Sequence, residues 1–367
     1  MLLKLLRQID KERFEPFVVS LGDEGVFGRL LERSGIPVVC LNWKRDHIPW
    51  IRGLSLVRAL RKLEPQIVQG WMYHGNVAAL LAAKLGLKTV PVIWGIRGTH
   101  IDIKKERTLS ALVIWLGARL SKYPKKIVNN SYRSASLHAT ELGYAIDNCV
   151  VIPNGFDTDQ FVPSMAARLN LRRELGLQEG AKLIGLVARF HEMKNHSGFL
   201  RSAYSLRNTD PDVNYVMVGE GVNSNNKSIM GQISDLAMQD RVHLLGSRHD
   251  MPQVFAAMDI VSVTSTYGEG FPNVIGEAMS CGVPCVVTDV GDSKWIVGDC
   301  GITVPPNDDN AFTLAWRSVL QLPEHERLLL GLNARRRVED YFSIAQVARQ
   351  YEELYYAVSG DSAVIAK

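Results

Sequence analysis

The stretch YGEGFPNVIGEAMSCGVPCVVT, residues 267–288, contains two glutamates, Glu269 and Glu277, with seven residues between them. Gly268 and Gly270 flank the first glutamate. Because glycine has no Cβ, the backbone at this point can turn tightly and come close to a ligand. Taken singly, each glutamate has a simpler interpretation, as a solvated loop charge or as a first-turn glutamate favoured by the helix dipole. The pair at this spacing favours a ligand-binding loop.

A short helix is predicted inside the same stretch. Asn273 is the expected cap, residues 274–281 the helix and residues 285–288 a buried strand, with a glycine and a proline between the two elements. Glu277 is then expected near the first turn, where unpaired amides and a partial positive charge favour a phosphate. A carboxylate accepts two hydroxyl donors at once, which suits a ribose or a sugar diol. The loop therefore suits a ligand that carries both an anion and hydroxyls.

Length and composition indicate a globular protein of two domains. The chain has 367 residues, of which 46% are hydrophobic, and at about 150 residues per domain this length suggests two domains. Five cysteines without a Cys-x-x-Cys pair argue against a disulfide framework and against a zinc site, and they favour a reducing, cytoplasmic compartment. The longest apolar run, residues 109–118, is far shorter than the roughly 20 residues of a membrane span.

Charge is distributed unevenly along the chain. Residues 1–155 carry 23 lysines and arginines against 12 aspartates and glutamates, a net charge of +11, whereas the remainder has a net charge of −7. One interpretation is that two solvated surfaces simply differ. The other is that the first half meets an anionic partner, such as the inner face of a membrane or a phosphorylated lipid. Nucleic acid is not expected, because no basic motif is interleaved with aromatic residues.

Helix and strand patterns alternate along the chain. In the first half, helices are expected at residues 1–9, 25–34, 51–63, 74–85, 107–120 and 132–142, and strands at 14–21, 37–41, 66–69, 90–94, 126–129 and 149–152. In the second half, strands are expected at 183–188, 213–218, 242–245, 260–264 and 285–288, and helices at 196–206, 228–238, 251–257, 311–320, 324–341 and 347–358. This alternation predicts an α/β fold in which helices cover both faces of parallel sheets.

Residues 151–163 are rich in turn formers and mark the expected boundary between a first domain, residues 1–155, and a second, residues 156–342. Asp157 and Asp159 in this segment are interpreted as turn residues rather than as metal ligands. Sheets of this kind usually open with a strand and a glycine-rich turn, whereas this chain opens with a helix. Either the fold is unusual, or a first strand and its glycine-rich loop are missing.

Two basic residues follow a predicted strand of the second domain. Arg189 and Lys194 come after residues 183–188, at the carboxyl end of the strand, where open α/β sheets bind ligands. The planar fork of an arginine and the point charge of a lysine together suit a diphosphate. Such residues are common in loops, but the glutamate loop follows another predicted strand of the same sheet, residues 260–264. This placement favours one shared site.

Four motifs together resemble glycosyltransferase family 4. They are ARFHEMK at residues 188–194, VGEG at 218–221, GEGFPNVIGE at 268–277 and VIPNGFD at 151–157. The resemblance covers nearly the whole chain. It implies the B-type fold of two Rossmann-like domains facing across a cleft, with the last helix, in residues 343–367, returning to the first domain. It also implies transfer of a sugar, with retention of configuration and without a cofactor or bound metal, from a nucleotide-sugar donor such as a UDP- or GDP-sugar.

The resemblance also implies roles for residues of the second domain. Arg189 and Lys194 would bind the donor diphosphate, and Glu277 would hold the ribose hydroxyls. Glu269 would face the donor sugar as a catalytic residue. The implied backbone contacts are those of Gly270, Phe271, Pro272, Asn273 and Val274 with the donor sugar and phosphates, and those of Leu245 and Gly246 with the nucleobase. Positive groups placed where negative charge develops on the diphosphate would speed its departure.

The first domain is expected to supply the acceptor side, a hydroxyl of a glycan or of a lipid-linked molecule in polysaccharide or glycolipid biosynthesis. His74 and Arg97 follow neighbouring predicted strands. His74 is interpreted either as a proton partner or hydroxyl ligand, or as a packing residue. Arg97 is interpreted either as a phosphate ligand or as a structural residue. Because relatives carry a histidine near Arg97 and a glycine-rich loop after a first strand, the alternative is a catalytically impaired nucleotide-sugar-binding protein. A dinucleotide-dependent oxidoreductase is excluded, because neither Gly-x-Gly turn continues as G-x-G-x-x-G.

Overall fold

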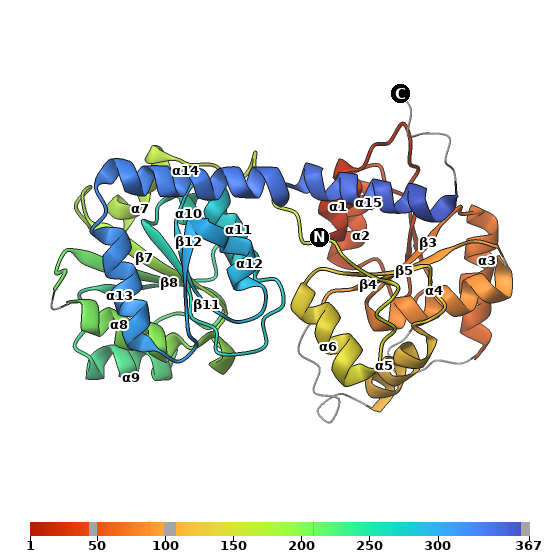
Figure 1. Cartoon of the computed structure of the whole chain (residues 1–367), viewed down its shortest axis with the longest axis horizontal. Helices are drawn as coiled ribbons and strands as arrows, with labels where there is room; N and C mark the ends of the chain where they lie inside the picture. Colours follow the sequence, from red (N-terminus) through yellow and green to blue (C-terminus); the bar gives the residue numbers. More distant parts are fainter. Residues whose placement is uncertain (44–49, 88, 99–107, 208, 361–367) are drawn as a thin grey trace. The chain divides into compact units, whose positions relative to one another are not determined.

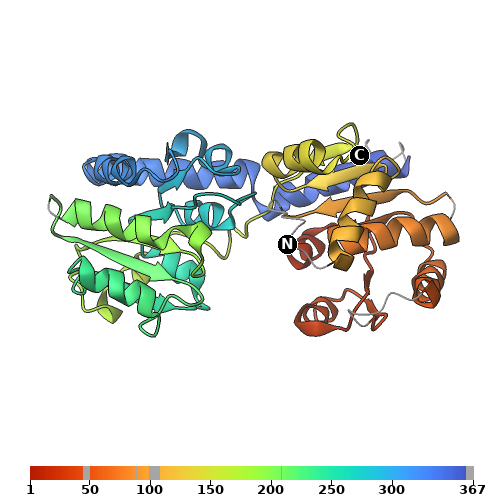
Figure 2. The same cartoon turned by 90° about the horizontal axis from the view of Figure 1, so that it is seen from below.

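The protein is described here by a computed structural model that covers residues 1–43, 50–87, 89–98, 108–207 and 209–360. The chain folds into two compact units (Figures 1 and 2). Unit 1 consists of Met1–Gly155 together with Ile344–Lys367, and unit 2 consists of Phe156–Ser343. Both units are α/β, and all strand pairs among the residues that the structure describes are parallel.

Unit 2 is built on a six-stranded parallel sheet in the order β12-β11-β10-β7-β8-β9. Its strands are β7 (Lys182–Val187), β8 (Val213–Val218), β9 (Val242–Gly246), β10 (Ile260–Val263), β11 (Cys285–Thr288) and β12 (Gly301–Val304). Its helices are α7 (Met165–Glu174), α8 (His196–Arg207), α9 (Lys227–Asp235), α10 (Met251–Ala256), α11 (Asn273–Ser280), α12 (Ser293–Val297), α13 (Asp309–Leu320) and α14 (Glu324–Tyr341), with short 3₁₀ turns η1 (Glu192–Lys194) and η2 (Gly298–Cys300).

Alternating side chains of the unit 2 strands enter two separate cores. One core joins the sheet to helices α8, α9 and α13 and contains Ile184, Tyr215 and Trp316. The other joins it to helices α7, α10, α11, α12 and α14 and contains Leu183 and Val216. Strands buried on both faces are typical of a parallel sheet whose crossovers carry helices to each side.

The order of the unit 2 strands reverses beside β7. From β7 the chain adds β8 and β9 on one side and then returns to add β10, β11 and β12 on the other side. The loops that follow β7 and β10 therefore leave two neighbouring strands in opposite directions. In open α/β sheets, this switch point at the carboxyl ends of the strands is where ligands bind.

The strands of unit 1 form two separate parallel sheets. Strands β1 (Val18–Ser20) and β2 (Val38–Cys40) pair with each other, and β3 (Val68–Trp71), β4 (Val92–Ile96), β5 (Lys126–Asn129) and β6 (Cys149–Val151) form a second sheet. The sheets remain separate because, among the described residues, no strand pairs with both β1 and β3.

The helices of unit 1 cover both faces of the four-stranded sheet (Figure 2). The helices of unit 1 are α1 (Leu2–Gln8), α2 (Gly25–Glu32), α3 (Trp50–Leu63), α4 (Met72–Gly86), α5 (Thr108–Leu120), α6 (Tyr132–Leu142) and the last helix, α15 (Ile344–Ser359). Of these, α2 packs with α1 and with the β1–β2 pair. Helix α15 packs with α1 through Leu5, Val347 and Tyr351, which share a core with the sheet residues Ile93 and Val128. The other face is covered by α3 and α4, through residues such as Leu60 and Leu80. Within the described part of the chain, no helix has both the length and the apolar character needed to cross a membrane.

Several predicted element boundaries are wrong. We expected Asn273 to cap helix α11, but Asn273 is the first residue of the helix and Pro272 is its N-cap. The ring of Pro272 fixes the φ angle of that residue. Glu277 is consequently the fifth helical residue, in the second turn rather than the first. Helices α7 and α12 and strand β12 were not predicted at all. Arg107, at which we expected a helix to begin, lies outside the described residues.

Candidate functional site

The loops that follow β7 and β10 are tied to each other at the switch point of unit 2. The Thr264 hydroxyl donates a hydrogen bond of 2.6 Å to the Lys194 carbonyl oxygen. The Thr266 amide donates one of 2.9 Å to the Met193 carbonyl oxygen. Because both bonds use main-chain atoms of the β7 loop, they fix where the Lys194 side chain starts, whatever its rotamer.

Lys194 and Glu269 form an ion pair between these two loops. Glu269 Oε1 also accepts a hydrogen bond of 2.6 Å from the Ser265 hydroxyl. The Lys194 side chain is 19% exposed and that of Glu269 is 9% exposed. An ion pair with so little solvent around it is screened less by salt than a surface pair. The switch point therefore holds a positioned ammonium group and a positioned carboxylate.

The backbone of the Glu269 loop is clamped from the far side by the loop that follows β11. The Asp292 amide donates a hydrogen bond of 2.8 Å to the Gly270 carbonyl oxygen. Gly291 has φ +63° and packs so closely that a Cβ there would lie 2.6 Å from the Glu269 carbonyl oxygen. The Thr288 hydroxyl adds a hydrogen bond of 2.6 Å to the Ser265 carbonyl oxygen. Only glycine fits at position 291, because of both its backbone angle and this contact.

Arg189 lies on the same edge of the sheet, on the β8 side. Its loop is held by a hydrogen bond of 2.7 Å from the Phe190 amide to the Glu220 carbonyl oxygen. Gly219, at φ +148°, lets the two loops touch, since a Cβ there would lie 2.2 Å from the Ala188 carbonyl oxygen. The Arg189 side chain is exposed, and within the described residues it forms no ion pair with Glu269. The structure thus joins Lys194 to Glu269 and leaves the Arg189 guanidinium in solvent.

Helix α11 carries the remaining predicted residues of this loop. The Phe271 ring is buried among Phe156, Trp295 and Phe342, so residues 270–274 can present only their backbone and the side chains of their exposed members. Gly276 is required here, because a Cβ would lie 2.1 Å from the Phe156 ring. Glu277 is half-buried one residue further along the helix.

The predicted nucleobase contacts differ between Leu245 and Gly246. The Gly246 amide donates to the Val222 carbonyl oxygen at 2.8 Å, and the Gly246 carbonyl oxygen accepts from the Gly219 amide at 2.8 Å. The pairing of β8 with β9 skips Leu245, since Met217 pairs with Leu244 and Val218 with Gly246. A bulged residue is left out of the ladder, so Leu245 is better placed than Gly246 to offer backbone groups to a ligand.

Both halves of the chain match models of known protein families. Residues 1–160 match the model described as Glycosyltransferase Family 4, and residues 181–321 match the model described as Glycosyl transferases group 1. The chain belongs to this glycosyltransferase family. The Escherichia coli protein named UDP-Gal:alpha-D-GlcNAc-diphosphoundecaprenol alpha-1,3-galactosyltransferase is 26% identical over 308 residues, which are 82% of this chain and 78% of that protein.

Solved structures agree with the glycosyltransferase assignment at the level of the fold. Alr3699/HepE from Anabaena in complex with UDP aligns with a TM-score of 0.81 over 97% of this chain and 95% of that chain, at 22% identity. A glycosyltransferase from Rickettsia africae aligns with a TM-score of 0.82 over 98% and 94%, at 18% identity. These similarities confirm the predicted α/β fold of the B type, with two Rossmann-like domains.

In unit 1 of the glycosyltransferase, His74 and Arg97 have different surroundings. His74 is an exposed residue in the first turn of α4. The Arg97 guanidinium donates to the Asn154 side chain and to the Tyr351 hydroxyl, and it lies 4.7 Å from the centre of the Trp71 ring. Arg97 therefore joins three structural elements of unit 1, which favours the structural interpretation of this residue. A ligand-binding role for either residue remains a prediction.

A hydrogen-bonded histidine in unit 1 was missed by the sequence analysis. The Tyr73 hydroxyl and His138 Nε2 lie 2.7 Å apart, and His138 Nδ1 lies 2.7 Å from the Ser134 carbonyl oxygen. Since Nδ1 must donate to the carbonyl, Nε2 accepts from Tyr73. Burial is the main cause that lowers the pKa of His138, so the ring is neutral. No motif signals this contact, because the two residues are 65 positions apart.

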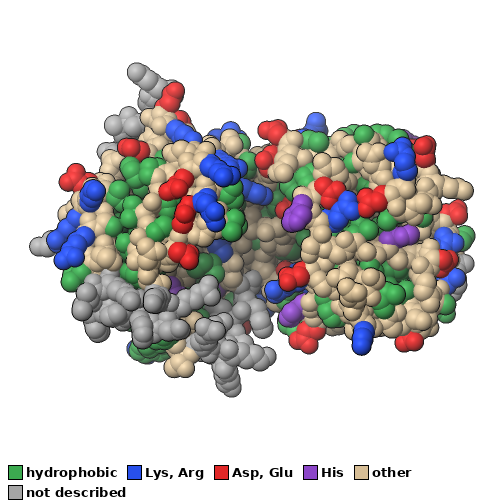
Figure 3. Space-filling model, turned by 180° about the vertical axis from the view of Figure 1, so that it is seen from behind, with side chains coloured by type: hydrophobic (Ala, Val, Ile, Leu, Met, Phe, Trp, Pro, Cys, Tyr) green, Lys and Arg blue, Asp and Glu red, His purple; other side chains and the backbone are tan. Residues whose placement is uncertain are grey.

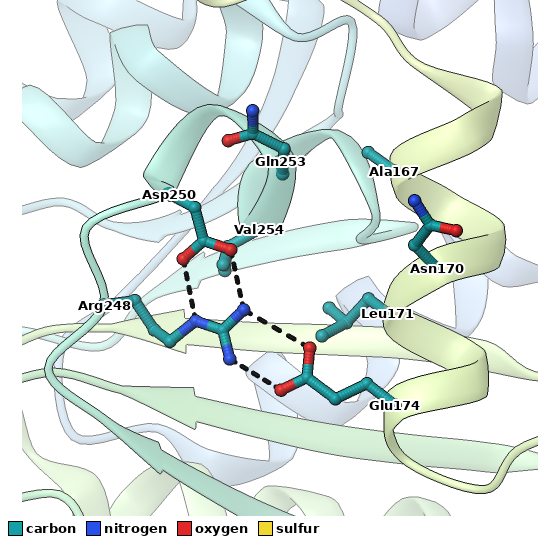
Figure 4. Close-up of a pocket in the computed structure, with 8 residues that line it drawn as sticks. All are labelled: Ala167, Asn170, Leu171, Glu174, Arg248, Asp250, Gln253 and Val254. Carbon is teal, nitrogen blue, oxygen red and sulfur yellow. Dashed lines mark hydrogen bonds and ion pairs between the residues drawn. The ribbon is translucent and has the colours of Figure 1, made fainter.

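A cavity of about 130 Å³ lies between α7 and α10, away from the switch point (Figure 4). Arg248 on its wall is bonded to both Glu174 and Asp250. Hydrogen bonds that Arg248 donates to these two carboxylates raise its pKa, so the guanidinium stays charged and is already paired with them. The cavity contains none of the predicted site residues, and it carries no free charge with which to bind a phosphate.

Proposed function

We propose that this glycosyltransferase moves a sugar from a nucleotide-diphosphate sugar, with UDP or GDP as the leaving group, to a hydroxyl of a glycan or lipid-linked acceptor. The transfer retains the anomeric configuration and needs no metal. The observation that carries this proposal is the pairing of Lys194 with Glu269 at the switch point of unit 2. The names of its relatives support the substrate class, because one is a UDP-galactose transferase and another was solved with UDP.

The ammonium group of Lys194 is proposed to stabilise the leaving diphosphate. When the bond between the sugar C1 and the diphosphate oxygen breaks, its electron pair remains on that oxygen, and positive groups lower the barrier where this charge develops. Lys194, the positive end of the helix dipole at the start of α11 and the exposed Arg189 are proposed to supply such groups. Because these groups come from the protein, the proposal assigns no role to a metal ion.

The carboxylate of Glu269 is proposed to hold the donor sugar and to keep Lys194 in place. A carboxylate accepts hydroxyl hydrogens, and one oxygen of Glu269 already accepts from Lys194 and Ser265. The acceptor hydroxyl forms its new bond to C1 on the face that the diphosphate leaves, and its proton passes to a phosphate oxygen. The other proposed contacts are Glu277 with the ribose, the backbone of Leu245 with the base, and His74 with the acceptor.

A transfer assay tests this function. The protein is incubated with UDP-, GDP- and ADP-sugars and with soluble and lipid-linked acceptors, with and without EDTA, and the anomeric configuration of the product is read by NMR. We expect one nucleotide sugar to react, with retention, at a rate that EDTA does not change. An inverted product would contradict the retaining mechanism. Binding of a nucleotide sugar without transfer to any acceptor would support a binding protein instead.

We further propose that the protein works in the cytoplasm, at the inner face of a membrane. The net charge of +11 on residues 1–155 supports contact with an anionic surface. The Escherichia coli relative is named for an acceptor attached to diphosphoundecaprenol, a lipid, and a lipid-linked acceptor would be met at a membrane. Fractionation of cells that express the protein, with and without a high-salt wash, tests this location.

A further inference from the structure

Helix α5 of unit 1 exposes an apolar stripe. Leu109, Leu112 and Trp115 follow one another at a spacing of three residues, and each is 44% to 54% exposed. At 100° per residue this spacing keeps all three on one side of the helix. Ile114 and Gly117 occupy the opposite side and are buried against the rest of unit 1. The stripe is therefore the outward side of a helix whose opposite side is already packed against the rest of unit 1.

Basic side chains continue the stripe beyond the end of the helix. Arg119 lies over the Trp115 ring, with its guanidinium carbon 4.6 Å from the ring centre. Lys122 and the neighbouring Lys84, from α4, both place their ammonium groups near the exposed Tyr123 ring, at 5.3 Å and 3.7 Å from its centre. The α4 residues Leu81 and Leu85 are also exposed, on either side of Lys84 in the sequence.

The region around these two helices is almost free of negative charge. Residues 65–140 contain eleven lysines and arginines, and their only acidic residues are Asp102 and Glu106. None of the described ranges 66–87, 89–98 and 108–140 contains an aspartate or a glutamate. The positive charge of unit 1 is thus concentrated in the part of the sequence that also carries the apolar stripe.

Exposed apolar side chains are common elsewhere, so exposure alone decides nothing. On the face shown in Figure 3, hydrophobic side chains lie among charged and polar ones on both units. On α14 of unit 2, for example, Leu329 and Leu332 are as exposed as the α5 leucine at position 112, but acidic residues Glu324 and Glu326 begin that helix. What distinguishes α5 is the combination of leucines and tryptophan with basic residues and no carboxylate.

We propose that the surface formed by Leu81, Lys84, Leu109, Leu112, Trp115, Arg119, Lys122 and Tyr123 docks the protein on a membrane of anionic phospholipids. Leucines on a helix that lies in the plane of a membrane enter the boundary between headgroups and acyl chains. Tryptophan and tyrosine rings favour the interface, and the basic residues attract anionic headgroups. This surface deepens the membrane location proposed above, and it needs no part of the sugar-transfer site.

Vesicle co-sedimentation of the full chain tests the docking surface. The bound fraction is measured with phosphatidylcholine vesicles and with vesicles that also contain phosphatidylglycerol. We expect binding only to the anionic vesicles, and weaker binding as salt rises. The double variant Leu112→Glu with Trp115→Glu should lower the partition coefficient more than about tenfold, since it replaces two inserted side chains with charges. The variant Arg119→Glu with Lys122→Glu should lower it by a similar factor.

The matched control is Leu329→Glu with Leu332→Glu on α14, which makes the same kind of change on exposed leucines of unit 2. This control should bind vesicles as the wild type does. All variants should keep the thermal shift given by the donor nucleotide, which reports that unit 2 is folded. Transfer to a soluble acceptor without vesicles should also be unchanged, so failure of docking is distinguishable from failure of the proposed function.

Three results would overturn the docking surface. The first is a wild-type protein that does not bind anionic vesicles. The second is equal loss of binding in the control and in the α5 variants. The third is a wild-type dimer, seen by size-exclusion chromatography with light scattering, that the α5 variants dissociate, because the stripe would then be covered by a second copy of the chain.

Discussion

The Lys194 ammonium is held by the Glu269 carboxylate at the end of β7, so each of these side chains sets the position of the other. We predict that Lys194→Ala and Glu269→Gln each lower kcat by about 10² to 10³, the usual loss when one group that stabilises developing charge is removed. Lys294→Ala, at an exposed lysine of the same unit, is the control and should keep full activity. Steady-state kinetics with the preferred donor give the comparison, and a variant of Lys194 with normal kcat would contradict the assignment.

A second prediction concerns the effect of a substitution at Gly291 on nucleotide binding. Gly291→Ala should abolish the thermal shift from the donor nucleotide, because the added methyl pushes on the Glu269 carbonyl oxygen from 2.6 Å. Gly176→Ala is a matched control, since Gly176 also has a left-handed φ, +67°, but no atom within 4 Å of its Cβ position. Both variants therefore share a strain of about 1 to 2 kcal/mol. Equal loss of the shift in both would show that strain alone is responsible.

The burial of His196 leads us to expect that the protein loses stability in acid. The residue is 3% exposed, and burial is the main cause that lowers its pKa to about 4, although the nearby Ala188 carbonyl opposes this shift. The contact between the His196 ring and the Ala188 carbonyl does not have hydrogen-bond geometry. Neither ring nitrogen of His196 therefore has a hydrogen-bond partner among the described residues. The unfolded chain takes up the proton near pH 6.5, before the folded one, so the stabilising contribution is complete above that pH and declines as pH falls toward 4.

The decline amounts to about 3 kcal/mol, from a shift of roughly two and a half pH units. We expect His196→Leu to be less sensitive to acid than the wild type over this range. Urea unfolding of both proteins at several pH values measures the difference, in which all other titrating groups cancel. Parallel curves for the two proteins would show that His196 is not responsible.

At the scale of elements, α7 is fixed to the sheet by a buried ion pair. Arg172 is fully buried; it bonds to Asp259 at 2.8 Å and donates to the Ala181 and Ala257 carbonyl oxygens. Burial lowers the pKa of Arg172 to about 10, and the Asp259 carboxylate opposes this shift, so the guanidinium stays charged at neutral pH. Arg168 bonds to the other oxygen of the same carboxylate.

We predict that Arg172→Ala destabilises unit 2 by about 3 kcal/mol, because it leaves Asp259 buried with one partner fewer. Arg173→Ala, at the exposed neighbour, should change stability by less than about 0.5 kcal/mol. Thermal unfolding of the two variants gives the comparison. Similar melting temperatures would show that the pair is replaceable.

Much of the element order was predictable, because apolar periodicity decides which segments become strands and helices. Helix α7 was missed even though Ser164 caps it, its hydroxyl accepting from the Ala167 amide. The segment directly follows the turn-rich boundary, and its apolar residues are confined to its first seven positions, with three charged residues at its end, so its pattern was weak. The division of unit 1 into two sheets was not predicted, since periodicity does not report which strands pair.

At the scale of the whole molecule, the sequence predicted that a lysine and a glutamate from two crossovers would share a site, and the strand order explains why. Both loops leave β7 and β10 at the switch point, so their meeting follows from topology alone. The direction in which an individual side chain points does not follow from topology. Arg189 points into solvent, and Arg97 is occupied by Asn154 and Tyr351, because long side chains settle by local contacts that lie far apart in sequence.

The two units also differ in net charge, which is +10 for unit 1, residues 1–155 with 344–367, and −6 for unit 2, residues 156–343. A negative unit must bind a doubly charged diphosphate, which is unfavourable at long range. Local cations therefore have to overcome the net field, and Lys194 and Arg189 are the ones that we propose for this task. The proposed binding of the diphosphate therefore depends on the loops after β7 and β10 rather than on the overall charge of the unit.

Hydrogen–deuterium exchange of the full chain, with and without the nucleotide diphosphate that gives the largest thermal shift, tests this dependence most directly. Our account predicts slower exchange in peptides that cover residues 188–194 and 265–277. Protection confined to unit 1, or to the cavity wall at Arg248, with no change in those two loops, would contradict it.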